Sequence, residues 1–234
     1  DGIKAGLEAG AGLVILCNPW NPVGRVLTEA EMRALQELVS RYDALVFSDE
    51  IHSPLVLSGR DFVSYARMGA EFASHTITAT AATKGWNIAG LPNAQVIIPD
   101  EGLRERWDSI CQEKLPHSMS TIGALGSIEA YTNGDEWQRE IFEVIECNIR
   151  AVSEALASTK IDFHPPQATY LTWWGFEAYP QFGDSPASVL LERAHIAVNA
   201  GITLGANYSK WARMNLACPP KVAEEMLSRV LGVL

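Results

Sequence analysis

The chain has 234 residues, of which 47% are hydrophobic and 20% charged, values typical of a globular protein with one or two domains. Lys and Arg number 18 against 28 Asp and Glu, giving a net charge of −10, and the basic residues are scattered along the chain. A nucleic-acid partner is therefore not expected, because phosphate binding requires a positively charged face. No apolar run reaches the roughly 20 residues that cross a bilayer, and no charged-then-apolar leader opens the chain, so we expect no membrane partner.

The four cysteines are far apart and include no C-x-x-C pair. They are Cys17, Cys111, Cys147 and Cys218. This spacing indicates neither a disulfide framework nor a zinc ribbon. We predict no metal site and a reducing, cytoplasmic location.

Residues 1 to about 100 alternate strand and helix patterns, which favours crossovers between parallel strands. Short apolar runs occupy residues 13–17, 45–48, 76–80 and 94–98. The first three are rich in branched residues and show no polar alternation, as expected for strands covered by helices on both faces. Thr28 with Glu31 three residues later predicts the capped start of a helix. The pattern indicates an α/β fold with a mostly parallel sheet flanked by helices.

Beyond Leu103 the pattern is helical until Asn133-Gly134, a strong turn signal. An amphipathic helix is predicted over residues 137–156. After it we expect a strand within 169–176, a helix over 186–195, extended pieces near 202–204 and 213–216, and a final helix from 221. This order predicts a large domain over residues 1–134 and a smaller α+β domain over residues 135–234.

Three polar residues follow the ends of predicted strands: Asn21, Asp49 and Lys84. In open α/β sheets the ligand crevice lies at the carboxyl ends of the strands, so we expect this amide, carboxylate and amine to meet in one crevice. The set suits a pyridine-ring cofactor that is bonded to the lysine through an aldehyde. The carboxylate would then face the ring nitrogen, and the amide would contact a ring oxygen.

Four motifs carry a resemblance to a known family. They are Asn18-Pro19-x-Asn21-Pro22-x-Gly24-Arg25, Ser48-Asp49-Glu50-Ile51-His52, Thr83 to Leu91, and Arg213 to Pro219. In this order they resemble the class I/II aminotransferase-fold enzymes that depend on pyridoxal phosphate, and most closely the cystathionine β-lyase branch that includes MalY and PatB. The resemblance implies the type I fold of these transferases. It also implies that an N-terminal portion of the family's fold is missing here.

The resemblance implies a role for each matched residue. Lys84 corresponds to the Schiff-base lysine, and burial would favour its neutral, nucleophilic amine. Asp49 corresponds to the carboxylate that pairs with the pyridine nitrogen, Asn21 to the amide at the phenolic oxygen, and Arg213 to the fork that holds the substrate carboxylate. The ordinary alternatives are a surface lysine, a helix cap or turn aspartate, a turn asparagine and a surface ion pair.

Other cofactor contacts are implied less directly. His52 stands where many relatives have a tyrosine near the phenolic oxygen, although a lone histidine is more often a satisfied polar residue. Ala81 replaces the family's phosphate-binding serine, so Thr80 and Thr83 are candidates to supply hydroxyl groups, or are simply good strand formers. Pro92 stands where aminotransferases commonly keep a phosphate-binding arginine.

Several aromatic residues have two interpretations. Tyr170, Trp173 and Trp174 are expected to pack the small domain rather than bind substrate. Trp86 either lines the site or belongs to the core.

The resemblance implies a carbon–sulfur β-lyase that acts on a small-molecule amino acid such as cystathionine, and a homodimer. The motifs do not separate this activity from an aminotransferase. A non-catalytic regulatory protein that retains the fold is the third alternative. Without the family's N-terminal portion, the chain alone is predicted to bind the cofactor weakly and to lack turnover.

Overall fold

The computed structural model describes residues 1–114 and 120–234. Its contacts divide the chain into two compact units. Unit 1 comprises Asp1–Trp20 and Val26–Gln138, and unit 2 comprises Asn21–Arg25 and Arg139–Leu234. The short segment 21–25 therefore belongs with the C-terminal part of the chain. The domain boundary between residues 134 and 135 stays a prediction.

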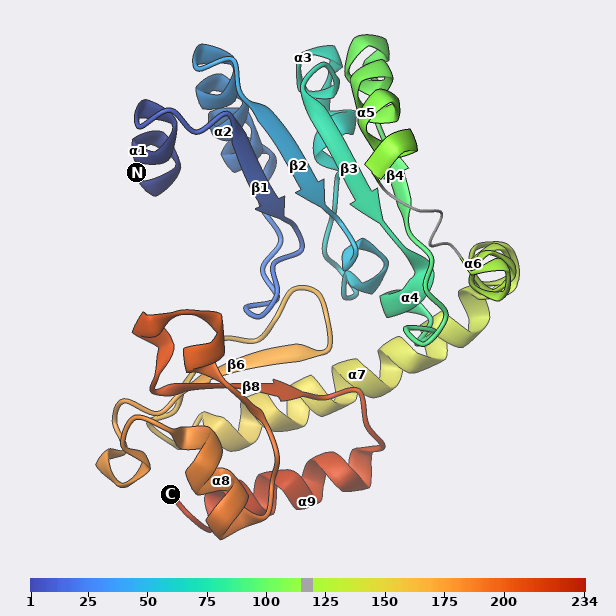
Figure 1. Ribbon diagram of the computed structural model, residues 1–234. Helices are drawn as coiled ribbons and strands as arrows, with labels where there is room; N and C mark the ends of the chain where they lie inside the picture. Colours follow the sequence, from blue (N-terminus) through green and yellow to red (C-terminus); the bar gives the residue numbers. More distant parts are fainter. Residues whose placement is uncertain (115–119) are drawn as a thin grey trace. The chain divides into compact units, whose positions relative to one another are not determined.

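Unit 1 is built on a four-stranded sheet in the order β1-β2-β3-β4 (Figure 1). The strands are β1 (Leu13–Cys17), β2 (Leu45–Asp49), β3 (Thr76–Thr80) and β4 (Gln95–Ile97). The first three are parallel and β4 pairs antiparallel with β3. The mostly parallel sheet and its four apolar runs are therefore confirmed.

Helices precede, connect and follow these strands. They are α1 (Gly2–Glu8), α2 (Glu29–Arg41), α3 (Ala70–Ala73), α4 (Ala82–Gly85), α5 (Glu101–Lys114), α6 (Thr121–Asn133) and the first turn of α7 (Asp135–Leu156), with 3₁₀ turns η1 (Ser53–Leu55) and η2 (Tyr65–Met68). The predicted capping box starts α2: Glu31 N–H donates to Thr28 Oγ1 at 3.3 Å, and Thr28 N–H donates to Glu31 Oε2 at 2.9 Å. The turn at Gly134 separates α6 from α7 as predicted.

The core of unit 1 covers the two sheet faces unequally. Val14 and Val46 pack against the apolar stripe of α2, whereas Ile77 packs against α5 on the other face. Ile15 is 73% exposed, and its neighbour Leu13 is 47% exposed. The expectation that helices cover both faces of every strand is therefore wrong for β1 within the described residues, because α2 lies on one face only.

Unit 2 contains an antiparallel sheet in the order β5-β6-β8-β7, with helices alongside it (Figure 1). Its strands are β5 (Asp162–Phe163), β6 (Leu171–Gly175), β7 (Asn199–Ala200) and β8 (Trp211–Asn215), and its helices are the rest of α7, α8 (Pro186–Ala194) and α9 (Pro220–Leu231), with 3₁₀ turns η3 (Pro180–Phe182), η4 (Gly201–Leu204) and η5 (Ala206–Tyr208). The predicted helices and the strands within 169–176 and 213–216 are confirmed to within a few residues.

One predicted extended piece is wrong. Residues 202–204 form the 3₁₀ turn η4 rather than a strand. Thr203 Oγ1 donates to the carbonyl of Ala200 at 2.6 Å, and Gly205 N–H donates to Ile202 O at 3.4 Å. These local bonds close the turn, and local side-chain bonds of this kind compete with strand pairing.

Trp86, Trp173 and Trp174 serve as packing residues. Trp174 is fully buried, and Trp173 stacks on Trp211 with ring centroids 5.4 Å apart, which confirms their expected role in unit 2. In unit 1 the Trp86 indole donates to Gly134 O at 3.0 Å, and its ring meets Tyr131 edge-on at 5.2 Å. These contacts support the core interpretation of Trp86.

Candidate active site

The carboxyl ends of β2 and β3 bring four predicted site residues to one edge of the unit 1 sheet. Asp49 ends β2 and pairs with Ala79, while Thr80 ends β3. Because β2 and β3 are parallel, their carboxyl ends lie at the same edge (Figure 1). The chain then enters the one-turn helix α4, which carries Thr83 and Lys84. A carboxylate, two hydroxyls and an amine therefore share this edge.

Lys84 lies in a tightly packed turn. Its neighbours Thr83 and Gly85 are buried, and a Cβ on Gly85 would approach the Pro54 side chain to 2.7 Å. The Lys84 side chain itself is half-buried, so the expected enclosure from water is not complete in this chain. Among the side chains of residues 1–111 and 120–234, no carboxylate lies within ion-pair distance of its amine. The backbone at Lys84 is thus held by packing, and its amine is not engaged by a carboxylate of the described side chains.

Asp49 is held by the backbone around it. Its Oδ1 accepts a hydrogen bond from Ile51 N–H at 3.2 Å, and its main-chain carbonyl accepts from Asn18 N–H at 3.0 Å. No basic side chain of the described residues lies within ion-pair distance of this carboxylate. Nearby His52 is buried, at 3% exposure, and precedes η1. The Asp49 carboxylate therefore keeps its charge available for a cationic partner.

The sequence interpretation assigned no role to Glu50, the residue after Asp49. Glu50 is only 4% exposed. Its Oε1 accepts hydrogen bonds from Ser48 Oγ at 2.8 Å, Ser64 Oγ at 3.0 Å and Tyr65 N–H at 3.1 Å. These hydrogen bonds connect the end of β2 to the start of η2. An acidic residue so close to the apolar run 45–48 was the only signal of this role in the sequence.

Burial raises the pKa of the Glu50 carboxyl above its ordinary value, and the hydrogen bonds from Ser48, Ser64 and Tyr65 offset part of that rise. A carboxyl whose pKa is higher in the folded state contributes stability that is fully present below the unfolded pKa. That contribution is lost as the pH rises through the folded pKa. Glu50 therefore favours the folded state least at neutral and alkaline pH.

We expect the Glu50→Gln variant to gain stability relative to the parent protein as the pH rises from about 4 to about 8. The amide keeps an acceptor for Ser48, Ser64 and Tyr65 but never ionises. Thermal unfolding at a series of pH values measures the difference in Tm between the two proteins. Glu37→Gln, at an exposed position of α2, is the matched control and should show no such trend. A Tm difference for Glu50→Gln that falls with rising pH would contradict the pKa direction.

Unit 2 brings two other predicted site residues into contact. Arg213 Nη1 donates to Asn21 Oδ1 at 3.0 Å, although these residues are far apart in the sequence. Its Nη2 donates to Asn199 Oδ1, also at 3.0 Å. Asn199 pairs directly with Arg213 in the β7–β8 ladder. Sequence reasoning missed Asn199 because a two-residue strand carries no periodic signal.

The guanidinium of Arg213 is held without being neutralised. No carboxylate of the described residues lies within ion-pair distance of it, and its buried Nε has no hydrogen-bond partner. Burial raises the pKa of the Tyr170 hydroxyl, and the Arg213 charge partly offsets this rise. A guanidinium that no carboxylate neutralises is suited to bind an anion such as a carboxylate.

The segment that carries Asn21 is fixed by Gly24. Gly24 has φ +71°, and its carbonyl accepts from Gln167 N–H at 2.7 Å and Ala168 N–H at 2.9 Å. A Cβ at this position would lie 2.7 Å from Ala168 O and in severe overlap with Pro166. Only glycine satisfies both the backbone angle and the close approach.

We expect Gly24→Ala to destabilise unit 2 by about 2–5 kcal/mol, the sum of left-handed strain and overpacking. Gly59→Ala is the matched control, because Gly59 has φ +74° but, apart from its chain neighbours, no residue comes within 4 Å of where its new methyl group would stand. It should lose only the strain term, about 1–2 kcal/mol. Chemical denaturation measures both losses. Equal losses in the two variants would contradict the role of the close contact.

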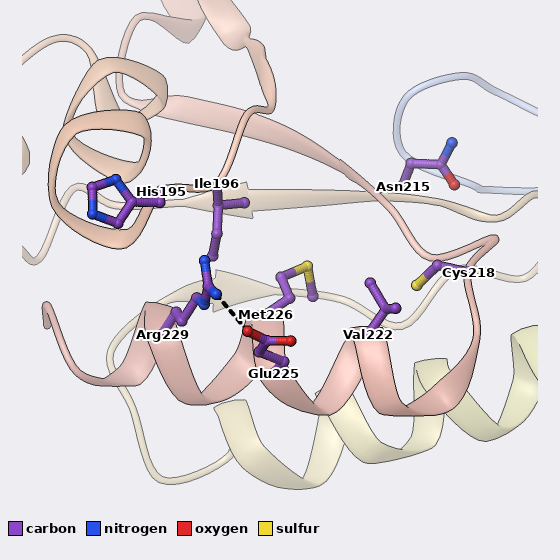
Figure 2. A pocket seen from close by; sticks show the side chains of 8 residues that line it. All are labelled: His195, Ile196, Asn215, Cys218, Val222, Glu225, Met226 and Arg229. Carbon is purple, nitrogen blue, oxygen red and sulfur yellow. Dashed lines mark hydrogen bonds and ion pairs between the residues drawn. The ribbon is translucent and has the colours of Figure 1, made fainter.

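Unit 2 also has a surface pocket of about 280 Å³ (Figure 2). Its eight lining residues are His195, Ile196, Asn215, Cys218, Val222, Glu225, Met226 and Arg229. Glu225 and Arg229 form an ion pair at its wall, so their charges neutralise each other. None of the predicted site residues lines this pocket.

The geometry can be compared with known proteins. The sequence pattern of the family described as "Aminotransferase class I and II" matches residues 1–230. The chain belongs to this family. Among its relatives, a cystathionine beta-lyase of Corynebacterium glutamicum is 32% identical over 232 residues, and cystathionine beta-lyase PatB of Bacillus subtilis is 31% identical over 225 residues. The matches cover 99% and 95% of this chain, but only 62% and 58% of those relatives.

Two solved structures resemble the chain over 99% of its length. Cystalysin from Treponema denticola, which contains a pyridoxal 5'-phosphate cofactor, has a TM-score of 0.92 and 27% identity, covering 99% of this chain and 60% of cystalysin. A C-S lyase from Staphylococcus hominis has a TM-score of 0.90 and 25% identity, covering 99% of this chain and 57% of the lyase. The type I aminotransferase fold expected from the motifs is confirmed.

The predicted site residues thus fall into two groups. Asp49, Thr80, Thr83 and Lys84, together with buried His52, belong to unit 1. Asn21 and Arg213 contact each other in unit 2. The predicted meeting of Asn21 with Asp49 and Lys84 involves both units and stays a prediction.

Two further features concern only the described part of the chain. None of its helices is long and apolar enough to cross a membrane. Its His, Cys, Asp and Glu side chains form no group of three or more that could hold a metal ion.

Proposed function

We propose that this chain carries the catalytic residues of a pyridoxal 5'-phosphate-dependent carbon–sulfur β-lyase that acts on an L-amino acid such as cystathionine. The observation that carries the proposal is the match of nearly the whole chain to proteins named cystathionine beta-lyase. The similarity to the cofactor-containing structures of cystalysin and of a C-S lyase supports it. Because the chain spans about 60% of these relatives, the activity belongs to the complete protein.

The residues present fit the cofactor by the chemistry of their donor groups. The Lys84 amine and the Asp49 carboxylate each lack an ion-pair partner among the described side chains, although they share one edge of the unit 1 sheet. Lys84 would bind the aldehyde, and Asp49 the ring nitrogen. Asn21 and His52 would hold the phenolic oxygen, and Thr80 and Thr83 the phosphate. When bound, the cofactor supplies an electron-withdrawing ring next to the substrate Cα.

Asp49 and Lys84 then have different roles in the proposed reaction. Asp49 would hold a proton on the ring nitrogen, because its carboxylate is oriented by Ile51 N–H and has no ion-pair partner among the described side chains. The Lys84 amine removes the proton from the substrate Cα as a general base. The close packing at Gly85 fixes the backbone from which the Lys84 side chain reaches the substrate.

Arg213 binds the substrate α-carboxylate in this proposal. Its guanidinium is oriented by Asn21 and Asn199 and keeps its charge. A bidentate contact would fix the carboxylate in the plane of the fork and so orient the Cα–H bond toward the base.

The net reaction on cystathionine consumes one water and yields homocysteine, pyruvate and ammonia. The test is incubation of the cofactor-loaded protein, expressed with any sequence that precedes residue 1 in its gene, with L-cystathionine. Free thiol and pyruvate in equal amounts are expected. Transfer of the amino group to a keto acid without thiol release would instead indicate an aminotransferase, an activity found in relatives such as the aspartate aminotransferase of Bacillus subtilis, 26% identical.

We also propose a cytoplasmic homodimer. None of the four cysteines, which all lie within the described residues, forms a disulfide, as is typical of proteins in a reducing compartment. Sedimentation equilibrium of the complete protein tests the dimer, and a monomer at micromolar concentration would contradict it.

A further inference from the structure

The two amide oxygens on Arg213 are a specific arrangement. Asn21 reaches Nη1 from the segment 21–25, and Asn199 reaches Nη2 from β7. These hydrogen bonds at both terminal nitrogens fix the plane of the guanidinium, because the group cannot rotate about its Cδ–Nε bond without breaking them. The N–H of Nε has no partner among the described residues.

Asn199 contributes to this arrangement through its side chain alone. The β7–β8 pairing of Asn199 with Arg213 uses the main chain and does not depend on the residue type. The Asn199 side chain is exposed, so it fills no core space. The contact that its side chain makes is the hydrogen bond to Arg213. Replacing the Asn199 side chain should therefore change its contact with the guanidinium without disturbing the fold.

The neutrality of both acceptors has a chemical consequence. An aspartate or glutamate on Arg213 would orient the fork equally well but would also neutralise it, and would compete with any incoming carboxylate. An amide oxygen orients the fork and leaves the full positive charge for the ligand.

We propose that Asn199 is a positioning residue for Arg213, which orients the guanidinium for an amino-acid carboxylate and preserves affinity by being uncharged. This inference rests on the proposed function of Arg213 and adds a residue that no sequence motif indicated. Asn199 does not touch the substrate in this proposal. It acts only through the fork.

The test compares Asn199→Asp with Asn215→Asp in the cofactor-loaded protein. Asn215 lies two residues beyond Arg213 on β8, and its side chain accepts from Ala217 N–H at 2.8 Å, a bond that a carboxylate keeps. Both variants add one negative charge to the same strand region, but only Asn199→Asp places it on the fork. Asn199→Ala removes the contact without adding charge.

Two readouts are needed. One is KM and kcat for the amino-acid substrate. The other is the Kd of 3-(methylthio)propionate, an amine-free carboxylate that cannot react, measured by calorimetry. Asn199→Asp is expected to raise both KM and Kd by about tenfold or more with kcat changed much less, because the added carboxylate occupies the fork. Asn199→Ala should raise both by only about two- to fivefold, and Asn215→Asp should leave both near the parent values.

The same substitutions in an Arg213→Lys background distinguish failure of the proposed role of Asn199 from failure of the proposed role of Arg213. There the effect of Asn199→Asp should shrink, because the fork through which it acts is gone. Equal effects of Asn199→Asp and Asn215→Asp, or an undiminished effect in the Arg213→Lys background, would overturn the role of Asn199 alone. An unchanged KM in Arg213→Lys itself would remove the proposed carboxylate clamp, and this inference with it.

Discussion

Lys84→Ala should lower kcat/KM for cystathionine cleavage by at least about 10⁴-fold, because it removes both the group that binds the cofactor aldehyde and the general base. The same variant should lose the visible absorbance of lysine-bound cofactor. Stability should change little, since the Lys84 side chain is half-buried and has no ion-pair partner among the described residues. Steady-state kinetics, absorbance spectra and Tm together measure these three effects.

Two further variants sharpen this prediction. Lys84→Arg keeps a positive charge but lacks a nucleophilic amine, so it should be as inactive as Lys84→Ala. Lys4→Ala removes an exposed lysine of α1 that pairs with Glu8 at 3.7 Å and should keep full activity. An active Lys84→Arg protein would show that position 84 contributes charge rather than covalent chemistry.

Arg213→Gln should raise KM for the amino-acid substrate by about 100-fold, with a smaller effect on kcat. The loss corresponds to one charge-assisted fork of roughly 3 kcal/mol. Asn21 and Asn199 lose their common donor, but both side chains retain access to water because Asn21 is half-buried and Asn199 exposed. The fold should therefore be retained, so steady-state kinetics can measure the increase in KM separately from the smaller change in kcat.

The control for this prediction is Arg193→Gln, which removes an exposed arginine from the last turn of α8. It carries the same charge change and should leave KM unchanged. Equal increases of KM in Arg193→Gln and Arg213→Gln would indicate a general electrostatic effect rather than a specific contact.

The sequence predicted most of unit 1 because its signals are local. Each of the first three strands is a short apolar run, and the capping box at Thr28 marks a helix start with two side-chain bonds. The polar residues at the strand ends were found because parallel strands place their carboxyl ends at one edge of a sheet. Asp49 and Lys84 both follow this rule.

The missed features depend on contacts between distant residues. The hydrogen bonds of Glu50 require Ser64 and Tyr65 to fold back onto the end of β2. No pattern near Glu50 in the sequence predicts that contact. Asn199 acts through a two-residue strand that is too short to show periodicity. The exposed face of β1 was missed because an apolar run of five residues does not reveal how many helices cover it.

The most direct test of the central claim is to locate the cofactor's covalent attachment. The complete protein, loaded with pyridoxal 5'-phosphate, is reduced with borohydride and digested, and the peptides are analysed by mass spectrometry. A stoichiometric phosphopyridoxyl group is expected on Lys84. A protein that carries the group on another lysine, or binds none under saturating cofactor, would contradict the assignment of this site.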